Sequence, residues 1–86
     1  MTVVVIGSMR FSPEAMAEVR PHLERLVAET RRHDGCVEYN AAEDVNDPGL
    51  VRFSEIWPSD ELLAAHLNAP HIAPWLNVSE HDQAIV

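Results

Sequence analysis

The sequence contains no lysine, and arginine supplies all 6 of its basic side chains, against 14 acidic ones. The formal net charge of -8 leaves no basic surface for the phosphates of a nucleic acid or an anionic membrane. The absence of lysine also excludes Schiff-base catalysis and a phosphate-binding P-loop, because both depend on a lysine amine. The composition therefore favours a small uncharged molecule as the substrate or ligand, and it predicts no nucleic acid and no membrane as partners.

Cysteine and long apolar runs are equally scarce. Cys36 is the single cysteine, so no internal disulfide can form, and we expect a cytoplasmic protein with a buried structural thiol. The N-terminal apolar run, residues 3–6, is too short for a signal peptide or a membrane span and predicts a strand. A chain of 86 residues has room for one domain, expected over residues 1–86, with a small core that a partner subunit would stabilise.

The first half of the chain predicts a strand followed by a helix. Residues 2–9 are β-branched and apolar, which is typical of a strand buried on both faces. Ser12 before Pro13 is typical of a helix start, since serine caps the first turn and proline fits the first helical position. Apolar residues then recur every three or four positions up to about His33, and Gly35 supplies the left-handed conformation that ends this amphipathic helix.

The second half predicts a hairpin, a short helix and a last strand. Residues 36–44 and 50–57 form two strands around a turn at 46–49. Ser59 is the expected N-cap of a helix over 62–67, and residues 83–86 are consistent with a fourth strand. The order β-α-β-β-α-β predicts an α+β, ferredoxin-like fold: an antiparallel four-stranded sheet with both helices on one face. The other face needs a second layer, which a second copy of the chain would supply.

Two histidines are the first candidate functional groups. His66 follows Leu62 by four positions on the apolar side of its helix, so its ring should be buried and needs hydrogen-bond partners. It is either a structural histidine or an acid/base group in a pocket. No third ligand at a useful spacing accompanies His66 and His71, so we expect no metal site.

The third strand carries a second candidate group. Phe53, Glu55 and Trp57 share one of its faces, and a carboxylate between two aromatic rings needs a partner if it is buried. This face is either plain core with a bracing glutamate or the wall of a ligand pocket. Further side chains that could complete such a cavity are Met9, Tyr39, Leu67, Ile72 and Trp75.

Four segments carry a resemblance to a known family, in this order along the chain: Asp34-Gly35-Cys36-Val37-Glu38-Tyr39, Asp47-Pro48-Gly49, Phe53-Ser54-Glu55-Ile56-Trp57 and Ala65-His66-Leu67-Asn68-Ala69-Pro70-His71. Over nearly its whole length the chain resembles the antibiotic biosynthesis monooxygenase (ABM) domain family, including its quinol-monooxygenase-like bacterial members. The Glu-x-Trp strand end and the Ala-His-Leu-x-x-Pro-His segment are the most specific parts. The resemblance implies a homodimeric α+β barrel in which two ferredoxin-like sheets pack face to face.

The resemblance also implies a cofactor-free monooxygenase that oxidises a small aromatic quinol- or anthrone-like substrate with O2. In this chemistry the pocket deprotonates a phenol, and the electron-rich anion reduces O2 without metal or flavin. The expected catalytic groups are His66, Glu55 and Tyr39. The residues expected to bind the substrate are Trp57, Phe53, His71, Trp75 and Met9.

Other activities of similar proteins fit less well or stay open. Haem-degrading relatives use a first-strand asparagine and a haem-ligating histidine, where this chain has Ile6-Gly7-Ser8 and Trp75-Leu76-Asn77-Val78, so haem degradation is not expected. One open alternative is a non-catalytic small-ligand-binding or accessory dimer. Another is an isomerase of the same fold, for which Arg10 and Arg52 are the few candidates for holding a phosphate.

Overall fold

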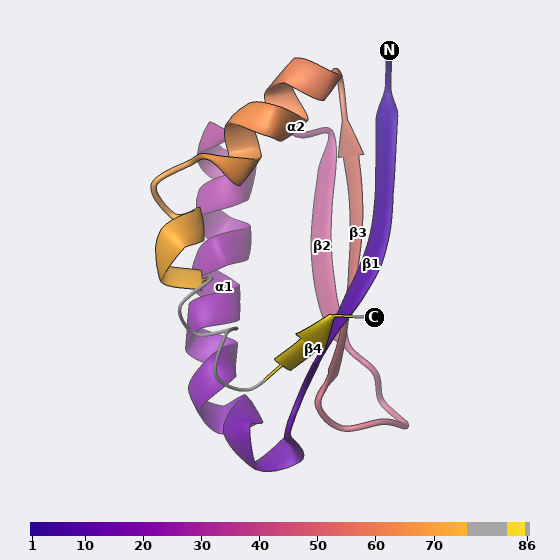
Figure 1. Ribbon diagram of the computed structural model, residues 1–86, viewed down its shortest axis with the longest axis vertical. Helices are drawn as coiled ribbons and strands as arrows, with labels where there is room; N and C mark the ends of the chain where they lie inside the picture. The colour runs from indigo at the N-terminus through magenta and orange to yellow at the C-terminus, as the bar shows by residue number, and fades with distance from the viewer. Residues whose placement is uncertain (76–82, 86) are drawn as a thin grey trace.

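In the described part of the chain, one sheet carries its helices on the same side (Figure 1). The computed structural model describes residues 1–75 and the backbone of 83–85. Its elements are β1 (Val3–Phe11), the 3-10 turn η1 (Pro13–Ala15), α1 (Met16–His33), β2 (Glu38–Glu43), β3 (Leu50–Trp57), α2 (Asp60–Leu67) and β4 (Gln83–Ile85). All neighbouring strands are antiparallel, in the order β2-β3-β1-β4. The predicted α+β ferredoxin-like fold is confirmed.

Several element ends differ from the predicted ones for local reasons. The first helix begins as a 3-10 turn, in which the backbone carbonyl of Ser12 accepts the N–H of Ala15 at 3.0 Å, and the Ser12 side chain makes no cap. β2 begins later than predicted, at Glu38. α2 begins two residues earlier than predicted, at Asp60, directly after its predicted cap, since Ser59 Oγ accepts the N–H of Leu62 at 3.2 Å.

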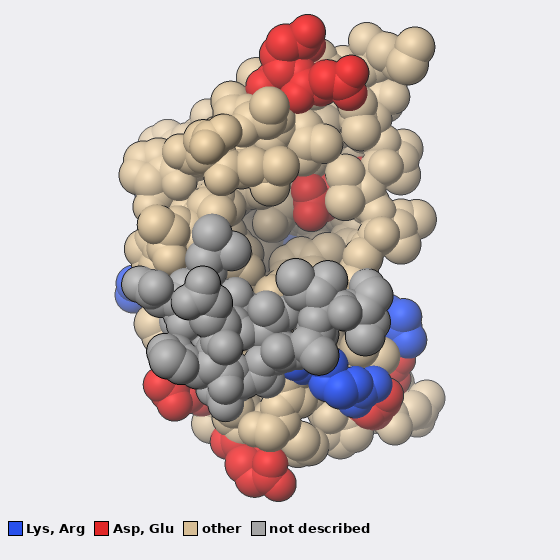
Figure 2. Space-filling model, in the orientation of Figure 1, with Lys and Arg blue, Asp and Glu red and all other residues tan. Residues whose placement is uncertain are grey.

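The core lies between the helices and the sheet. α1 buries one stripe of side chains, as its three- and four-residue spacing predicts: Met16, Val19, Leu23, Leu26 and Thr30. Alternate residues of the strands pack against this stripe from the sheet, among them Phe11, Tyr39, Val51, Phe53 and Trp57. Figure 2, in the orientation of Figure 1, shows a hollow between the helices and the sheet, with an acidic side chain inside it. No helix in the described ranges is long and apolar enough to cross a membrane.

The opposite side of the sheet, which we call the outer face, is uncovered by any element of residues 1–75 or 83–85 (Figure 1). Its apolar part consists of Val4, Ile6 and Ile56. Val4 is 63% exposed and Ile6 is 83% exposed, while Ile56, the cross-strand partner of Val4, is half-buried. The prediction that the first strand is buried on both faces is therefore wrong for the single chain, because α1 and α2 cover only one of them.

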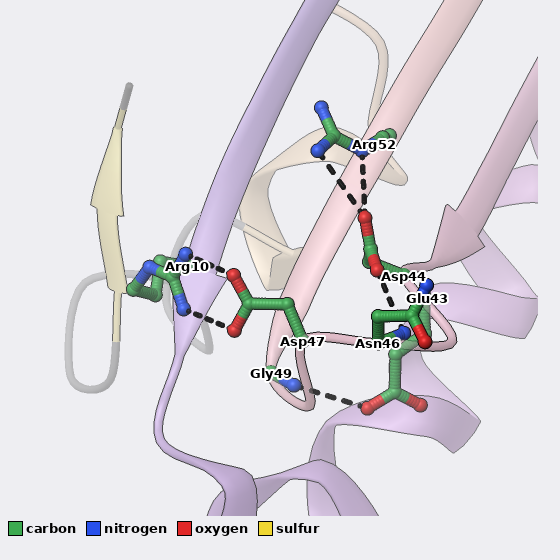
Figure 3. A network of polar contacts seen from close by, with 7 residues as sticks. All are labelled: Arg10, Glu43, Asp44, Asn46, Asp47, Gly49 and Arg52. Atoms are coloured by element: carbon green, nitrogen blue, oxygen red, sulfur yellow. Dashed lines mark hydrogen bonds and ion pairs between the residues drawn. The ribbon is translucent and has the colours of Figure 1, made fainter.

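Ion pairs hold the β2–β3 loop in place (Figure 3). Arg10 on β1 donates two hydrogen bonds to Asp47, at 2.7 and 3.0 Å, and holds the pKa of that carboxyl below its usual range. Arg52 on β3 donates to Asp44 through two nitrogens, each at 3.2 Å. Because these pairs are exposed, each contributes little to stability, but together they engage both arginines considered above for binding phosphate.

Candidate functional site

Five of the predicted site residues meet in the layer between the sheet and the helices: Tyr39, Phe53, Trp57, His66 and Trp75. The ring centroids of Tyr39 lie 6.2 Å from Trp57 and 6.4 Å from Phe53, and Phe53 lies 6.4 Å from Trp75, all edge to face. All five side chains are buried. The folded chain thus gathers an aromatic cluster from β2, β3, α2 and the helical turn that includes Trp75.

Glu55 is a buried carboxylate within this cluster. It lies on the same face of β3 as Trp57, and its Oε1 accepts the indole N–H at 2.9 Å. The partner that a buried carboxylate needs is therefore Trp57, the aromatic residue of the Glu-x-Trp segment itself. The hydrogen bond also fixes the plane of the indole ring against which His66 lies.

His66 is the buried imidazole of the cluster, with 3% of its side chain exposed. Its ring centroid lies 4.7 Å from that of Trp57 and 5.1 Å from that of Tyr39. On the other side of the ring, Nδ1 lies 2.6 Å from Oδ2 of Asp34. A carboxylate acceptor at Nδ1 favours the tautomer that carries its proton there and leaves the lone pair on Nε2.

Asp34 joins His66 to the second predicted histidine. The same Oδ2 atom lies 2.8 Å from Nε2 of His71, and only 8% of the Asp34 side chain is exposed. Asp34 precedes Gly35 at the predicted end of the first helix and was not among the predicted site residues, although a buried histidine pair needs an acceptor. The ground on which a metal site was excluded is also wrong, since Asp34 is a third potential ligand beside the pair.

Tyr39 is a neutral phenol in this setting. Burial raises its pKa well above the ordinary value, and the nearby carboxylates Glu55 and Asp34 raise it further. A phenol with a raised pKa donates hydrogen bonds and does not act as a base near neutral pH. Among the three residues predicted to be catalytic, the role of base is thus left to His66 and Glu55.

Two other residues singled out in the sequence stand apart from the histidines. Met9 on β1 is half-buried and packs against the edge of the core, and its strand partners are Val51 and Ile85. Cys36 is also half-buried, and burial raises the pKa of its thiol, as a structural cysteine requires. Within the described residues, neither side chain is hydrogen-bonded to His66 or Asp34, so the site is centred on the aromatic cluster and the Asp34–His66–His71 group.

The chain is similar in sequence and in fold to known proteins. The family description "Antibiotic biosynthesis monooxygenase" matches residues 2–77. Rv0793 of Mycobacterium tuberculosis, a candidate monooxygenase by its name, is 33% identical over 69 residues, which cover 80% of this chain and 67% of Rv0793. The crystal structure of an antibiotic biosynthesis monooxygenase superposes with a TM-score of 0.89 at 30% identity, covering 100% of this chain and 94% of that one. A candidate enzyme of the same kind from Deinococcus radiodurans gives 0.85 at 28% identity, with coverage of 100% and 88%. The chain therefore belongs to the antibiotic biosynthesis monooxygenase family.

Proposed function

We propose that this chain is a cofactor-free monooxygenase acting on a small, uncharged aromatic substrate of the quinol or anthrone type. The environment of His66 carries the proposal. This buried imidazole is held at Nδ1 by Asp34, and its ring contacts those of Tyr39 and Trp57. Its Nε2 is then a base in aromatic surroundings, as deprotonation of a phenol requires. Family membership supports the same reaction class.

The reaction needs no electrons from outside the substrate. His66 Nε2 takes the hydroxyl proton of the phenol or of an enolised anthrone, and the resulting anion transfers an electron to O2. Recombination of the two radicals forms a carbon–oxygen bond, and cleavage of the peroxide O–O bond leaves one oxygen atom in a new carbonyl and releases the other as water. With an anthrone, oxidation of the ring CH2 group to a carbonyl supplies the four electrons that O2 accepts. With a quinol, hydroxylation of one ring carbon supplies two of them and oxidation of the quinol to the quinone supplies the other two, so that the retained oxygen atom is in a hydroxyl group.

The other polar groups of the cluster suit a substrate that becomes an anion. The neutral Tyr39 phenol can donate a hydrogen bond to a developing phenolate oxygen. One carboxylate oxygen of Glu55 is already engaged, because it accepts the Trp57 indole N–H. The aromatic side chains around them would stack on a flat ring system.

Oxygen uptake tests this function. Purified protein is supplied with a panel of anthrones and quinols in an oxygen electrode, without added metal, flavin or nicotinamide. We expect uptake with at least one substrate, and 18O2 should deliver one labelled atom to the product. Absence of uptake with every compound, from a protein shown to be folded, would contradict the proposal.

A non-catalytic ligand-binding role is the second candidate. It is favoured by the close packing of the aromatic rings, which contact one another as core side chains do. It predicts that the same compounds raise the melting temperature without any oxygen uptake. The isomerase alternative is weakened, since Arg10 and Arg52 are engaged by Asp47 and Asp44.

We also propose that the protein is a homodimer joined through its outer face. Exposed Val4 and Ile6 and half-buried Ile56 form an apolar surface on a sheet side that no described element covers. Wild-type protein should sediment as a dimer at micromolar concentration, and Ile6→Glu should sediment as a folded monomer. Val45→Glu, at an equally exposed apolar residue of the β2–β3 loop, is the matched control and should remain dimeric. A wild-type monomer would refute the dimer.

We propose a cytoplasmic location as well. The single cysteine lies half-buried with its Sγ 3.9 Å from the carbonyl oxygen of Thr30, a position that suits a thiol kept reduced. Trapping of the thiol state in cells by alkylation would show a reduced cysteine.

A further inference from the structure

We propose that Asp34, His66 and His71 bind one divalent cation of the late first transition row, with Zn2+ as the preferred ion. This inference does not rest on the proposed function. An ion bound at Nδ1 of His66 would leave the ring proton on Nε2, so the metal-bound form would lack the base proposed above and the ion would inhibit the oxygenase. The three residues come from the end of α1, from α2 and from the turn after α2, and each offers one ligand atom. The donors are two imidazole nitrogens and a carboxylate oxygen, a common set in zinc sites.

The ligand atoms are already near the spacing that a zinc ion requires. Oδ2 of Asp34 lies 2.6 Å from Nδ1 of His66 and 2.8 Å from Nε2 of His71, and all three atoms lie within 4.8 Å of one another. Tetrahedral zinc with bonds of about 2.0–2.1 Å places its ligand atoms ~3.3 Å apart. The site therefore forms when Asp34 moves back by less than about 1 Å and the two imidazole nitrogens approach each other, changes that rotation of the Asp34 and His71 side chains can supply.

Access to the cluster is provided by a surface groove. The groove has a volume of about 540 Å³ and is lined by Arg25, Glu29, His33, Asp34, Pro70 and His71. Two of the three ligands, Asp34 and His71, lie on its wall, whereas His66 is buried behind them. A metal held by three side chains at such a wall keeps a fourth position open toward water, as catalytic and regulatory zinc sites do.

The surroundings favour a cation and select its class. The chain has a net charge of -8 and no lysine, so its overall field attracts cations. Arg25 is the only arginine that lines the groove, whereas His33 is paired with Glu29 at 3.3 Å. Two imidazoles suit Zn2+, Co2+ and Cu2+, while Mg2+ and Ca2+ prefer sites made of oxygen ligands.

Titration calorimetry with Zn2+, on protein free of any affinity tag, tests the site. We expect one ion bound per chain and no comparable binding of Mg2+. His71→Gln and Asp34→Asn should weaken the affinity by roughly tenfold or more, since losing a ligand costs at least as much as losing an outer partner of one. His33→Gln, which changes an imidazole on the same groove wall, is the matched control and should bind as the wild type does.

A second measurement uses wild-type protein only, so it stands even if a variant does not fold. Added Co2+ should give visible absorption bands of a low-coordinate site, and its paramagnetism should shift the ring-proton resonances of two of the 5 histidines most strongly, with Zn2+ displacing it. No saturable Zn2+ binding would overturn the proposal. So would equal loss of affinity in His33→Gln and His71→Gln, or Co2+ shifts spread over all histidines.

Discussion

Replacing Gly49 with alanine is expected to destabilise this protein more than the same replacement at either of its other two glycines. Gly49 has a φ of +92°, in the left-handed region, and a Cβ built there would lie 2.1 Å from the carbonyl oxygen of Phe11. The neighbouring backbone cannot retreat easily, because the N–H of Phe11 donates to the carbonyl of Gly49 at 2.7 Å. Conformational strain and the steric overlap together should cost about 3 kcal/mol or more, out of a total stability of ~5–15 kcal/mol.

Urea denaturation of Gly49→Ala and Gly7→Ala measures this effect. Gly7 is the matched control, since nothing lies within 4 Å of a Cβ built on it and its φ is not positive. Alanine at position 7 should leave stability unchanged or raise it by less than about 1 kcal/mol, because glycine is unfavourable inside a strand. Equal denaturation midpoints for the two variants would show that the close approach of Gly49 and Phe11 does not constrain the fold.

Replacing His66 with asparagine is expected to abolish most oxygen uptake while leaving the chain folded. The side-chain amide nitrogen of asparagine occupies nearly the place of Nδ1 in histidine, so it can still donate to Asp34. The variant lacks Nε2, however, and with it the base that takes the phenolic proton. Loss of a general base lowers kcat by about 10²- to 10⁴-fold.

Steady-state oxygen uptake and circular dichroism, measured on the same samples, separate chemistry from folding. Asp34→Asn should also lower kcat, because an amide can donate to Nδ1 and so favour the tautomer with its proton on Nε2. His33→Gln is the control and should keep wild-type activity, since His33 is exposed and pairs with Glu29. If folded His66→Asn retains full kcat, His66 is a structural histidine and the base must be sought elsewhere, with Glu55 next.

Local signals were sufficient for most of the fold. Gly35 has a φ of 75° where the sequence predicts the end of the first helix, and Ser59 caps α2 as predicted. β3 runs over Leu50–Trp57, the predicted span. These features depend on residues within a few positions of one another, so their physical causes, capping, turn geometry and side-chain alternation, can be read along the chain.

Contacts between distant segments could not be predicted in the same way. The sequence alone placed Phe53, Glu55 and Trp57 on one face of a strand and His66 on the apolar side of a helix, both of which follow from periodicity. It assigned no contact partner to Asp34, which lies 32 positions before His66 and 37 before His71.

The tertiary structure decided that contact. α2 packs over the turn at Gly35, where both methyl groups of Leu62 lie 3.7 Å from the position of an added Cβ. That packing brings His66 and then His71 down onto the end of α1, where Asp34 lies. Because the apolar surfaces of α1, α2 and the sheet determine how the helices dock, the carboxylate meets both histidines only in the folded chain. A short-range sequence pattern therefore cannot predict the contacts of Asp34 with the two histidines.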